Sequence, residues 1–171
     1  AGAIQDYGRG IVVGEQSFGK GTVQSLVPLK EGQLKITESK FYRVSGDSTQ
    51  HRGVIPDIYF PSLFDPTQIG ESALDNALAW DRISPASFQR YRDFDEILPK
   101  LTAMHNKRAT SNADYRYLLD QVEMARKTRE ITSLPLLESG RLAMRDEQES
   151  KALEIENRRR LAKGMTLLLC L

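Results

Sequence analysis

The hydrophobic and polar positions divide the chain into two parts with different periodicities. Up to about residue 60, short apolar runs alternate with glycines and polar turns, which is typical of β-strands. Segments 22–29 and 33–44 predict two strands, and residues 30–32 (Lys-Glu-Gly) between them are typical of a hairpin turn. The first part of the chain is therefore expected to form a partial β-sheet.

Three shorter elements complete this first part. Residues 1–7 resemble the last turns of a helix that stops at Gly8, and residues 11–13 predict a short buried strand. Residues 54–60 predict an edge or terminal strand, because Pro56 cannot donate a ladder hydrogen bond.

Beyond residue 70 the apolar positions follow helical spacing. Ser72 is suited to cap a helix that runs to Trp80, and Pro85 is suited to the first turn of a second helical segment, interrupted near Pro99. A clearer helix begins at Ser111 and carries an apolar stripe, which predicts packing against a neighbour. These segments predict a mainly helical region.

The last elements are a charged helix and an apolar tail. Residues 138–163 predict a long helix with too few apolar positions for a coiled-coil seam. The fold class expected from the whole pattern is α+β, a partial α/β-type catalytic sheet followed by a mainly α-helical domain. The expected divisions are 1–60 for the sheet region, 61–71 for a linker, 72–164 for the helical domain and 165–171 for the tail.

Lys20 is the residue that most strongly suggests chemistry. It lies between Gly19 and Gly21 in a turn between two apolar strands, and Phe18 and Val23 are placed to wall it. Desolvation lowers the pKa of a lysine, and a neutral amine can act as a general base. We therefore expect Lys20 to be a desolvated candidate base.

Two other readings of this turn are less well supported by the sequence. Gly14 and Gly19 have the spacing of a phosphate-binding loop, but Thr22 stands one position too late and begins a strand rather than a helix. Ser17 forms Ser-x-x-Lys with Lys20, a spacing that some serine hydrolases use at the start of a helix. The glycines around Lys20 break any helix, so Ser17 is disfavoured as a nucleophile.

Several motifs in order resemble one known family. The Ser-Phe-Gly-Lys-Gly core at 17–21 with Gln24, the segments 34–37 and 40–46, and the run 48–57 that ends in Gly-Val-Ile-Pro-Asp are similar to the lysine segment and closing signature of tail-specific, or C-terminal processing, proteases. Residues 61–163, notably 70–80, resemble the helical C-terminal extension of the long Gram-negative branch.

This resemblance implies a serine peptidase with a Ser-Lys dyad. Lys20 matches the family's general base, and Gln24 matches the glutamine that positions it; an amide does not titrate but can accept a hydrogen bond from the amine. The nucleophilic serine of the family lies about two dozen residues before the lysine, so the chain is expected to begin after it and to be inactive alone. The resemblance also implies a periplasmic location and protein substrates with apolar C-terminal tails.

Composition changes this picture little. The 24 basic and 23 acidic residues leave a net charge of +1, so no nucleic-acid partner is expected, and the run Arg158–Arg160 follows acidic residues as at a solvated helix end. One cysteine and two distant histidines predict neither a disulfide nor a metal site, and no cofactor is expected.

The helical part leaves a second function class open. Nothing in it carries recognisable chemistry, so a non-enzymatic scaffold or protein-interaction module is the alternative to a protease. The helices and the tail at 165–171 are candidate surfaces for self-association, the tail as a short strand added to an exposed edge.

Overall fold

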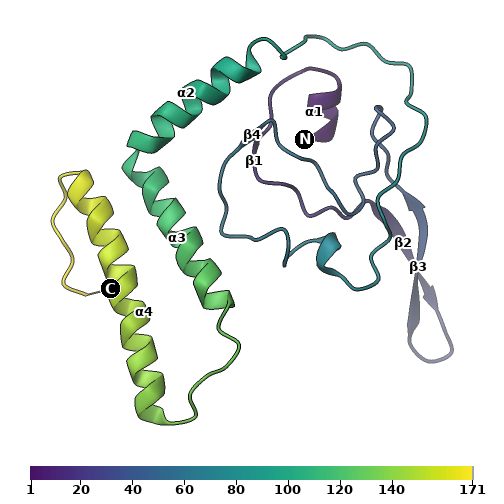
Figure 1. Ribbon diagram of the computed structural model, residues 1–171. Helices are drawn as coiled ribbons and strands as arrows, with labels where there is room; N and C mark the ends of the chain where they lie inside the picture. Colours follow the sequence, from purple (N-terminus) through teal and green to yellow (C-terminus); the bar gives the residue numbers. More distant parts are fainter. Residues whose placement is uncertain (171) are drawn as a thin grey trace. The chain divides into compact units, whose positions relative to one another are not determined.

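The computed structural model describes residues 1–170 and divides at Lys100 into two compact units. Figure 1 shows that the first unit holds the strands, long loops and one short helix, whereas the second unit is mainly helical. The α+β class predicted from the sequence, with helices in the C-terminal part, is confirmed.

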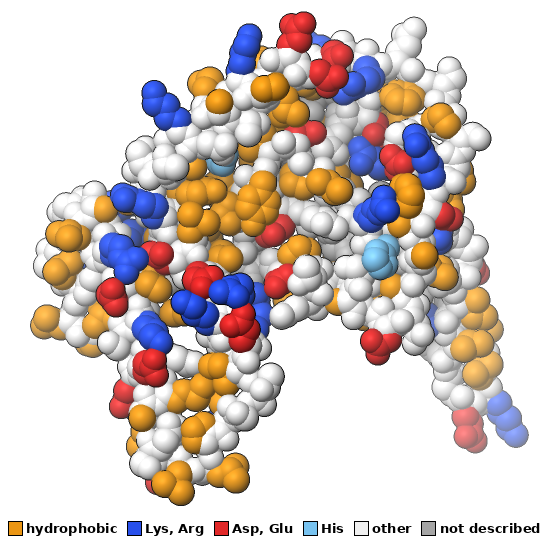
Figure 2. All heavy atoms as spheres, in the orientation of Figure 1, with side chains coloured by type: hydrophobic (Ala, Val, Ile, Leu, Met, Phe, Trp, Pro, Cys, Tyr) orange, Lys and Arg blue, Asp and Glu red, His pale blue; other side chains and the backbone are white. Residues whose placement is uncertain are grey.

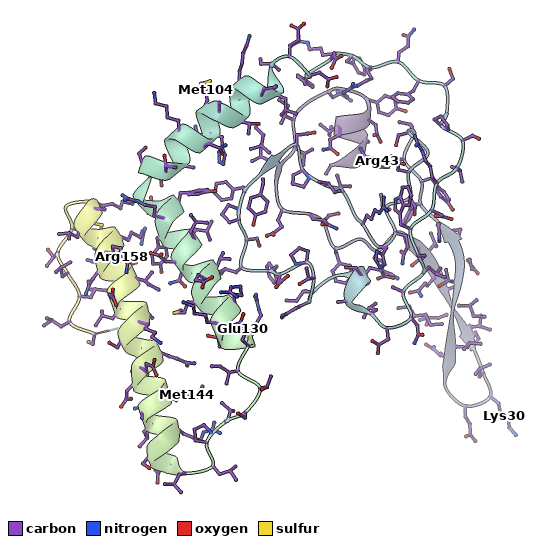
Figure 3. The ribbon with its side chains drawn as sticks, viewed as in Figure 1. Lys30, Arg43, Met104, Glu130, Met144 and Arg158 are labelled. Carbon is purple, nitrogen blue, oxygen red and sulfur yellow. The ribbon has the colours of Figure 1, made fainter. Side chains whose placement is uncertain are left out.

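A long antiparallel hairpin is the main sheet of the first unit. It joins β2 (Thr22–Pro28) to β3 (Gln33–Lys40), and a β-bulge shifts the register between Val23 and Gln24. Lys30 lies at its tip (Figure 3). The predicted hairpin is confirmed, and it exposes several hydrophobic side chains, some of which are visible along this element in Figure 2.

A second, very short sheet pairs β1 (Val13–Gly14) with β4 (Ile58–Tyr59) in parallel. The expected buried strand at 11–13 is wrong in its burial, because Val13 is 54% exposed. Asp57 accepts a hydrogen bond of 2.8 Å from the amide of Val12, so this carboxylate ties the two strands together.

The N-terminal helix is confirmed and is fixed by an ion pair. α1 (Gly2–Asp6) ends before Gly8, whose φ is +59°. Arg43, which lies after β3, donates to both carboxylate oxygens of Asp6 at 2.7–3.1 Å. This half-buried pair joins the start of the chain to the loop that follows the hairpin.

The helix predicted from Ser72 to Trp80 is wrong. A single 3-10 turn, η1 (Glu71–Ala73), forms there, and Leu74 is already extended. The Ser72 hydroxyl donates to the carbonyl of Pro66 at 3.4 Å, so this contact directs it away from capping.

The helical segment predicted from Pro85 is also wrong. Backbone groups there bond to distant segments, with Ala86 N donating to Val44 O at 2.9 Å and Tyr91 N donating to Tyr7 O at 2.8 Å. The first long helix is α2 (Leu98–Ser111), and Pro99 lies in its first turn, where proline sacrifices no helical hydrogen bond.

Two further helices of the second unit agree with the sequence pattern. α3 (Ala113–Arg129) is capped by Asn112, whose side chain accepts from Tyr115 N at 2.9 Å, and α4 (Glu138–Ala162) is the long charged helix. Their packing gives the α3 stripe its neighbour within the chain.

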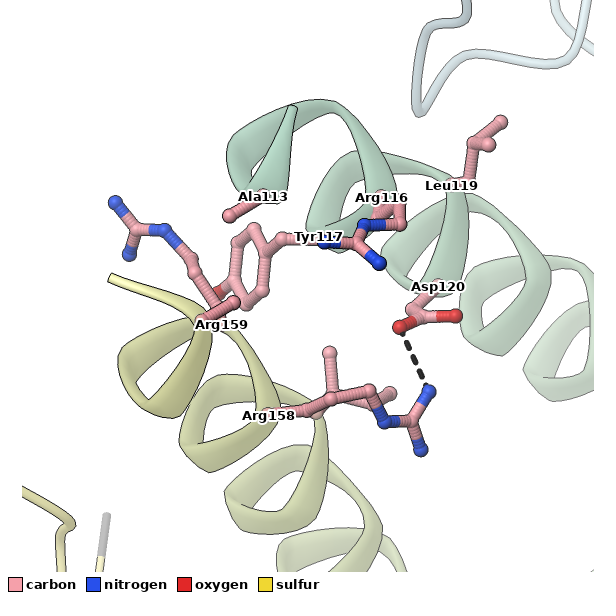
Figure 4. A pocket seen from close by; sticks show the side chains of 9 residues that line it. Ala113, Arg116, Tyr117, Leu119, Asp120, Arg158 and Arg159 are labelled. Atoms are coloured by element: carbon pink, nitrogen blue, oxygen red, sulfur yellow. Dashed lines mark hydrogen bonds and ion pairs between the residues drawn. The ribbon is translucent and has the colours of Figure 1, made fainter. Parts of the chain in front are cut away.

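Charged residues line the α3–α4 contact. Arg158 of α4 bonds Asp120 of α3 at 3.0 Å beside a cavity of about 190 Å³, as Figure 4 shows. Arg159 stacks over Tyr117 at 5.0 Å and bonds Asp114. The arginine run lies at the end of α4, as the sequence predicted, and its members form ion pairs there that the sequence analysis did not predict.

The tail does not form the expected strand over its described residues. Residues 165–170 fold back toward α4, where the Asn157 side chain exchanges two hydrogen bonds of 2.7–2.9 Å with the backbone of Leu168. The last residue of the predicted tail, Leu171, lies outside the described residues. Among the helices described, none combines the length and apolar character needed to cross a membrane.

Candidate functional site

Lys20 and Gln24 are brought together by the start of β2. The Lys20 amine donates to Gln24 Oε1 and to Thr22 Oγ1, both at 2.9 Å. Thr22 and Gln24 lie on either side of Val23 at the start of β2, and both side chains reach the amine although the bulge between Val23 and Gln24 interrupts the regular alternation of the strand. Two side-chain oxygens therefore fix the direction of the amine.

The far end of the Gln24 amide is anchored on the opposite strand. Gln24 Nε2 donates to Thr37 Oγ1 at 3.1 Å, and these two residues are cross-strand partners next to the bulge. With its nitrogen used by Thr37, the amide oxygen is left to face Lys20. The sequence analysis gave Thr22 no contact to the amine, and Thr37 could be found only once the register was known.

The glycines beside Lys20 are required by close backbone packing. A Cβ on Gly21 would lie 2.4 Å from the amide nitrogen of Gln50, and one on Gly19 would lie 2.8 Å from the carbonyl oxygen of His51. Gly19 also has a φ of +86°. The loop at 49–53 is thus pressed directly against the lysine turn.

Buried polar groups hold the two loops together. Gln50 is fully buried, and its Oε1 accepts from Gly21 N at 2.8 Å. Its Nε2 donates to Glu71 Oε1 at 2.8 Å, and Glu71 N donates to Phe18 O at 2.8 Å. Neither Gln50 nor Glu71 was singled out from the sequence; the only signal was the position of Gln50 in the closing signature.

The expected desolvation of Lys20 is wrong for the residues described. Lys20 is exposed, and its predicted walls are open, with Phe18 51% and Val23 37% exposed. Phe18 instead borders a hollow with Phe64, Pro66 and Ile69. The turn orients the amine but leaves it in contact with solvent.

The neighbouring polar residues have structural roles. Ser17 Oγ accepts from Val54 N at 2.8 Å, and Ser17 N donates to Val54 O at 3.1 Å, so its hydroxyl supports the 49–54 loop. His51 lies in that loop with a φ of +67°. Residues after Lys20 form β2 rather than a helix, which removes the helix N-terminus that a phosphate-binding loop needs.

Two family models match different parts of the chain. Residues 1–60 match the model of peptidase family S41, and residues 64–169 match the model described as the C-terminal domain of tail specific protease.

Individual relatives agree with these matches. The chain is 36% identical to the tail-specific protease of Haemophilus influenzae over 96% of its length, which is 25% of that relative. It is 51% identical to the carboxy-terminal-processing protease of Bartonella bacilliformis over 34% of the chain and 14% of that relative. The carboxy-terminal processing protease CtpB of Bacillus subtilis is 42% identical over 34% of the chain. The chain thus spans about a quarter, or less, of the first two relatives.

Proposed function

Since the chain belongs to the tail-specific protease family, we propose that it is part of a Ser-Lys endopeptidase in which Lys20 is the general base. The observation that carries this proposal is the paired hydrogen bonding of the Lys20 amine to Thr22 and Gln24. Such contacts hold an amine in line for a proton transfer that requires geometry to within about 0.5 Å.

In this mechanism the amine accepts the proton of a serine hydroxyl as that oxygen attacks a peptide carbonyl. Ser17 is not the serine proposed here, because the Lys20 amine bonds Thr22 and Gln24 while the Ser17 hydroxyl supports the backbone of Val54, so we place the nucleophile outside these 171 residues. Gln24 has a positioning role, since it holds the amine without titrating.

The substrates proposed are proteins recognised through apolar C-terminal tails, in the periplasm. The relatives are a tail-specific protease and a carboxy-terminal-processing protease, which supports recognition at the C-terminus. The preference for apolar tails is tested with two peptide substrates that differ only in their C-terminal residues, which are apolar in one peptide and acidic in the other. The apolar peptide is expected to be cleaved faster, and cell fractionation tests the location.

The experiment on the base compares Lys20→Ala with Lys30→Ala in the full-length protein that contains this sequence. Lys30 lies exposed at the hairpin tip and is the matched control. We expect Lys20→Ala to lower kcat by a factor on the order of 10³ or more, and Lys30→Ala to leave it unchanged. Equal activity of the two variants would remove Lys20 from the mechanism.

A measurement on the same preparations addresses the alternative of a scaffold. If the unaltered full-length protein binds tailed peptides but never cleaves them, a binding module replaces the protease. Sedimentation of the full-length protein tests the proposed self-association.

A further inference from the structure

The most deeply buried side chain of the first unit lies under the lysine turn. Gln50 is 0% exposed, and both ends of its amide are bonded within the protein. Its oxygen accepts from the amide of Gly21, the residue after Lys20, and its nitrogen donates to the carboxylate of Glu71.

Glu71 contacts the same turn from the other side. Its carboxylate accepts a hydrogen bond from Gln50 Nε2 at 2.8 Å, and its own backbone amide donates to the carbonyl of Phe18 at 2.8 Å. Glu71 is only 7% exposed. The turn is therefore held at Phe18, two residues before Lys20, and at Gly21, one residue after it.

We propose that Gln50 and Glu71 are positioning residues for Lys20, and that the first residues of the C-terminal domain complete the lysine turn of the peptidase domain. This inference rests on the proposed function, in which Lys20 is the base. Gln50 belongs to the segment that matches the peptidase family, whereas Glu71 belongs to the segment that matches the C-terminal domain.

The direction of the hydrogen bonds dictates which residue types fit. Position 50 must accept from Gly21 N and donate to residue 71, and an amide does both. Position 71 needs only an acceptor facing Gln50. A buried group that loses its partner carries the full desolvation cost, so the pair constrains the turn strongly.

Loss of the Gln50–Glu71 pair is expected to change the position of the base and not its identity. Lys20 contacts neither Gln50 nor Glu71 through its amine, so loss of the pair moves the base without removing it. A displacement of about 1 Å costs on the order of 10²-fold in rate. Since the proposal assigns the pair a role in placing the base and none in binding substrate, we expect the loss to fall on kcat rather than on KM.

The test uses the full-length protein and a peptide substrate. Gln50→Ala and Glu71→Ala are each expected to lower kcat about 10- to 100-fold, with KM within about twofold. Gln50→Glu places a second carboxylate next to that of Glu71, and the repulsion between them is expected to lower kcat as much as the alanine substitutions do. Gln68→Ala, an exposed glutamine of the segment between positions 50 and 71, is the control and keeps full kcat.

The exchange variant separates hydrogen bonding from packing. In Gln50→Glu with Glu71→Gln, the new carboxylate accepts from Gly21 N and from the new amide, so the pair is rebuilt in reverse. This double variant is expected to regain most of the kcat lost in Gln50→Glu, with thermal unfolding followed on the same samples. A role in stability alone would change the folded fraction and the rate in proportion.

The outcomes distinguish this inference from the function on which it rests. If Lys20→Ala keeps its activity, the proposed base is wrong. If Lys20→Ala is inactive while Gln50→Ala and Glu71→Ala keep full kcat, the positioning role is wrong. Should the alanine variants fail to fold, an exchange variant no more active than Gln50→Glu contradicts the inference.

Discussion

The two units of the chain are stabilised in different ways. In residues 1–100 the buried side chains include Thr22, Ser48, Gln50 and Glu71, which are fixed by hydrogen bonds, and glycines that let loops approach closely. From Leu101 onward, α3 and α4 are joined at exposed ion pairs, such as Arg158 with Asp120. Buried hydrogen bonds and close backbone contacts fix a geometry that tolerates few substitutions. Exposed ion pairs contribute little to stability, so their residues can be substituted at a small cost.

Apart from removal of the Lys20 base itself, the largest expected effect comes from adding one methyl group to the lysine turn. In Gly21→Ala the new Cβ would meet backbone at 2.4 Å, so the loops must separate. We expect a loss of activity of at least about 100-fold and destabilisation of about 3 kcal/mol, measured by peptide hydrolysis and denaturant unfolding of the full-length protein.

Gly164→Ala is the matched control in the helical unit. A Cβ there meets open space and only the φ of +67° is unfavourable, so the cost is about 1 kcal/mol and activity is kept. If the two variants behave alike, the contrast between the units is wrong.

A smaller effect is expected from the positioning amide. Gln24→Ala removes one of the two acceptors of the Lys20 amine and is expected to lower kcat about 10- to 100-fold. Gln33→Ala changes the same residue type at the start of β3, where it is exposed, and is expected to keep full kcat. Steady-state kinetics of both variants give the answer, and a Gln24→Ala enzyme with unchanged kcat would refute the positioning role.

Removing an ion-pair centre from the helical unit is expected to matter less. Asp114 accepts from Arg159 and Lys163, and Asp114→Asn weakens both contacts between α3 and the end of α4. We expect a small fall in the thermal midpoint of the helices by circular dichroism and no change in kcat. Asp146→Asn, which alters an exposed contact within α4, is the control; a large loss of activity in Asp114→Asn would contradict the independence of the turn.

Acid is expected to have a gradual effect on the same helices. Hydrogen bonds from Arg126 and then Lys127 lower the pKa of Glu123 from 4.5 to about 2. Because the folded pKa is the lower one, this stabilisation is present above pH 4.5 and is lost as the pH falls toward 2. In a Glu123→Gln variant, the free energy of unfolding should fall less than in the unaltered protein as the pH drops from 4.5 toward 2. A variant with the same pH dependence of unfolding as the unaltered protein would contradict this role of Glu123.

Local patterns in the sequence predicted the elements whose stability is local. The hairpin follows from its apolar runs and turn, α3 follows from the helical spacing of its apolar stripe, and α4 follows from a long run of charged residues without glycine or proline breaks after Gly140. The family of the chain was also predicted, from several motifs that occur in the expected order. The glycines in these motifs are needed where two backbone segments pack closely, so their positions are informative in a way that overall composition is not.

Long-range contacts explain what the sequence did not predict. Ser72 has the type of an N-cap, but its hydroxyl bonds Pro66 O, and the backbone after Pro85 bonds to residues more than thirty positions away. The buried pair of Gln50 and Glu71 likewise joins segments 21 residues apart, so neither residue's spacing reveals the contact. Lys20 was found from the glycines on either side of it and Gln24 from its match to the family motif, and both signals lie within a few residues of one another in the sequence.

Amide hydrogen exchange at Gly21 tests most directly whether the lysine turn is built in advance. The account predicts that the Gly21 amide, bonded to the buried Gln50, exchanges as slowly as the paired amides of β2 in this chain, and at least about tenfold faster in Gln50→Ala. A Gly21 amide that exchanges at the rate of an unstructured glycine in the unaltered chain would contradict it.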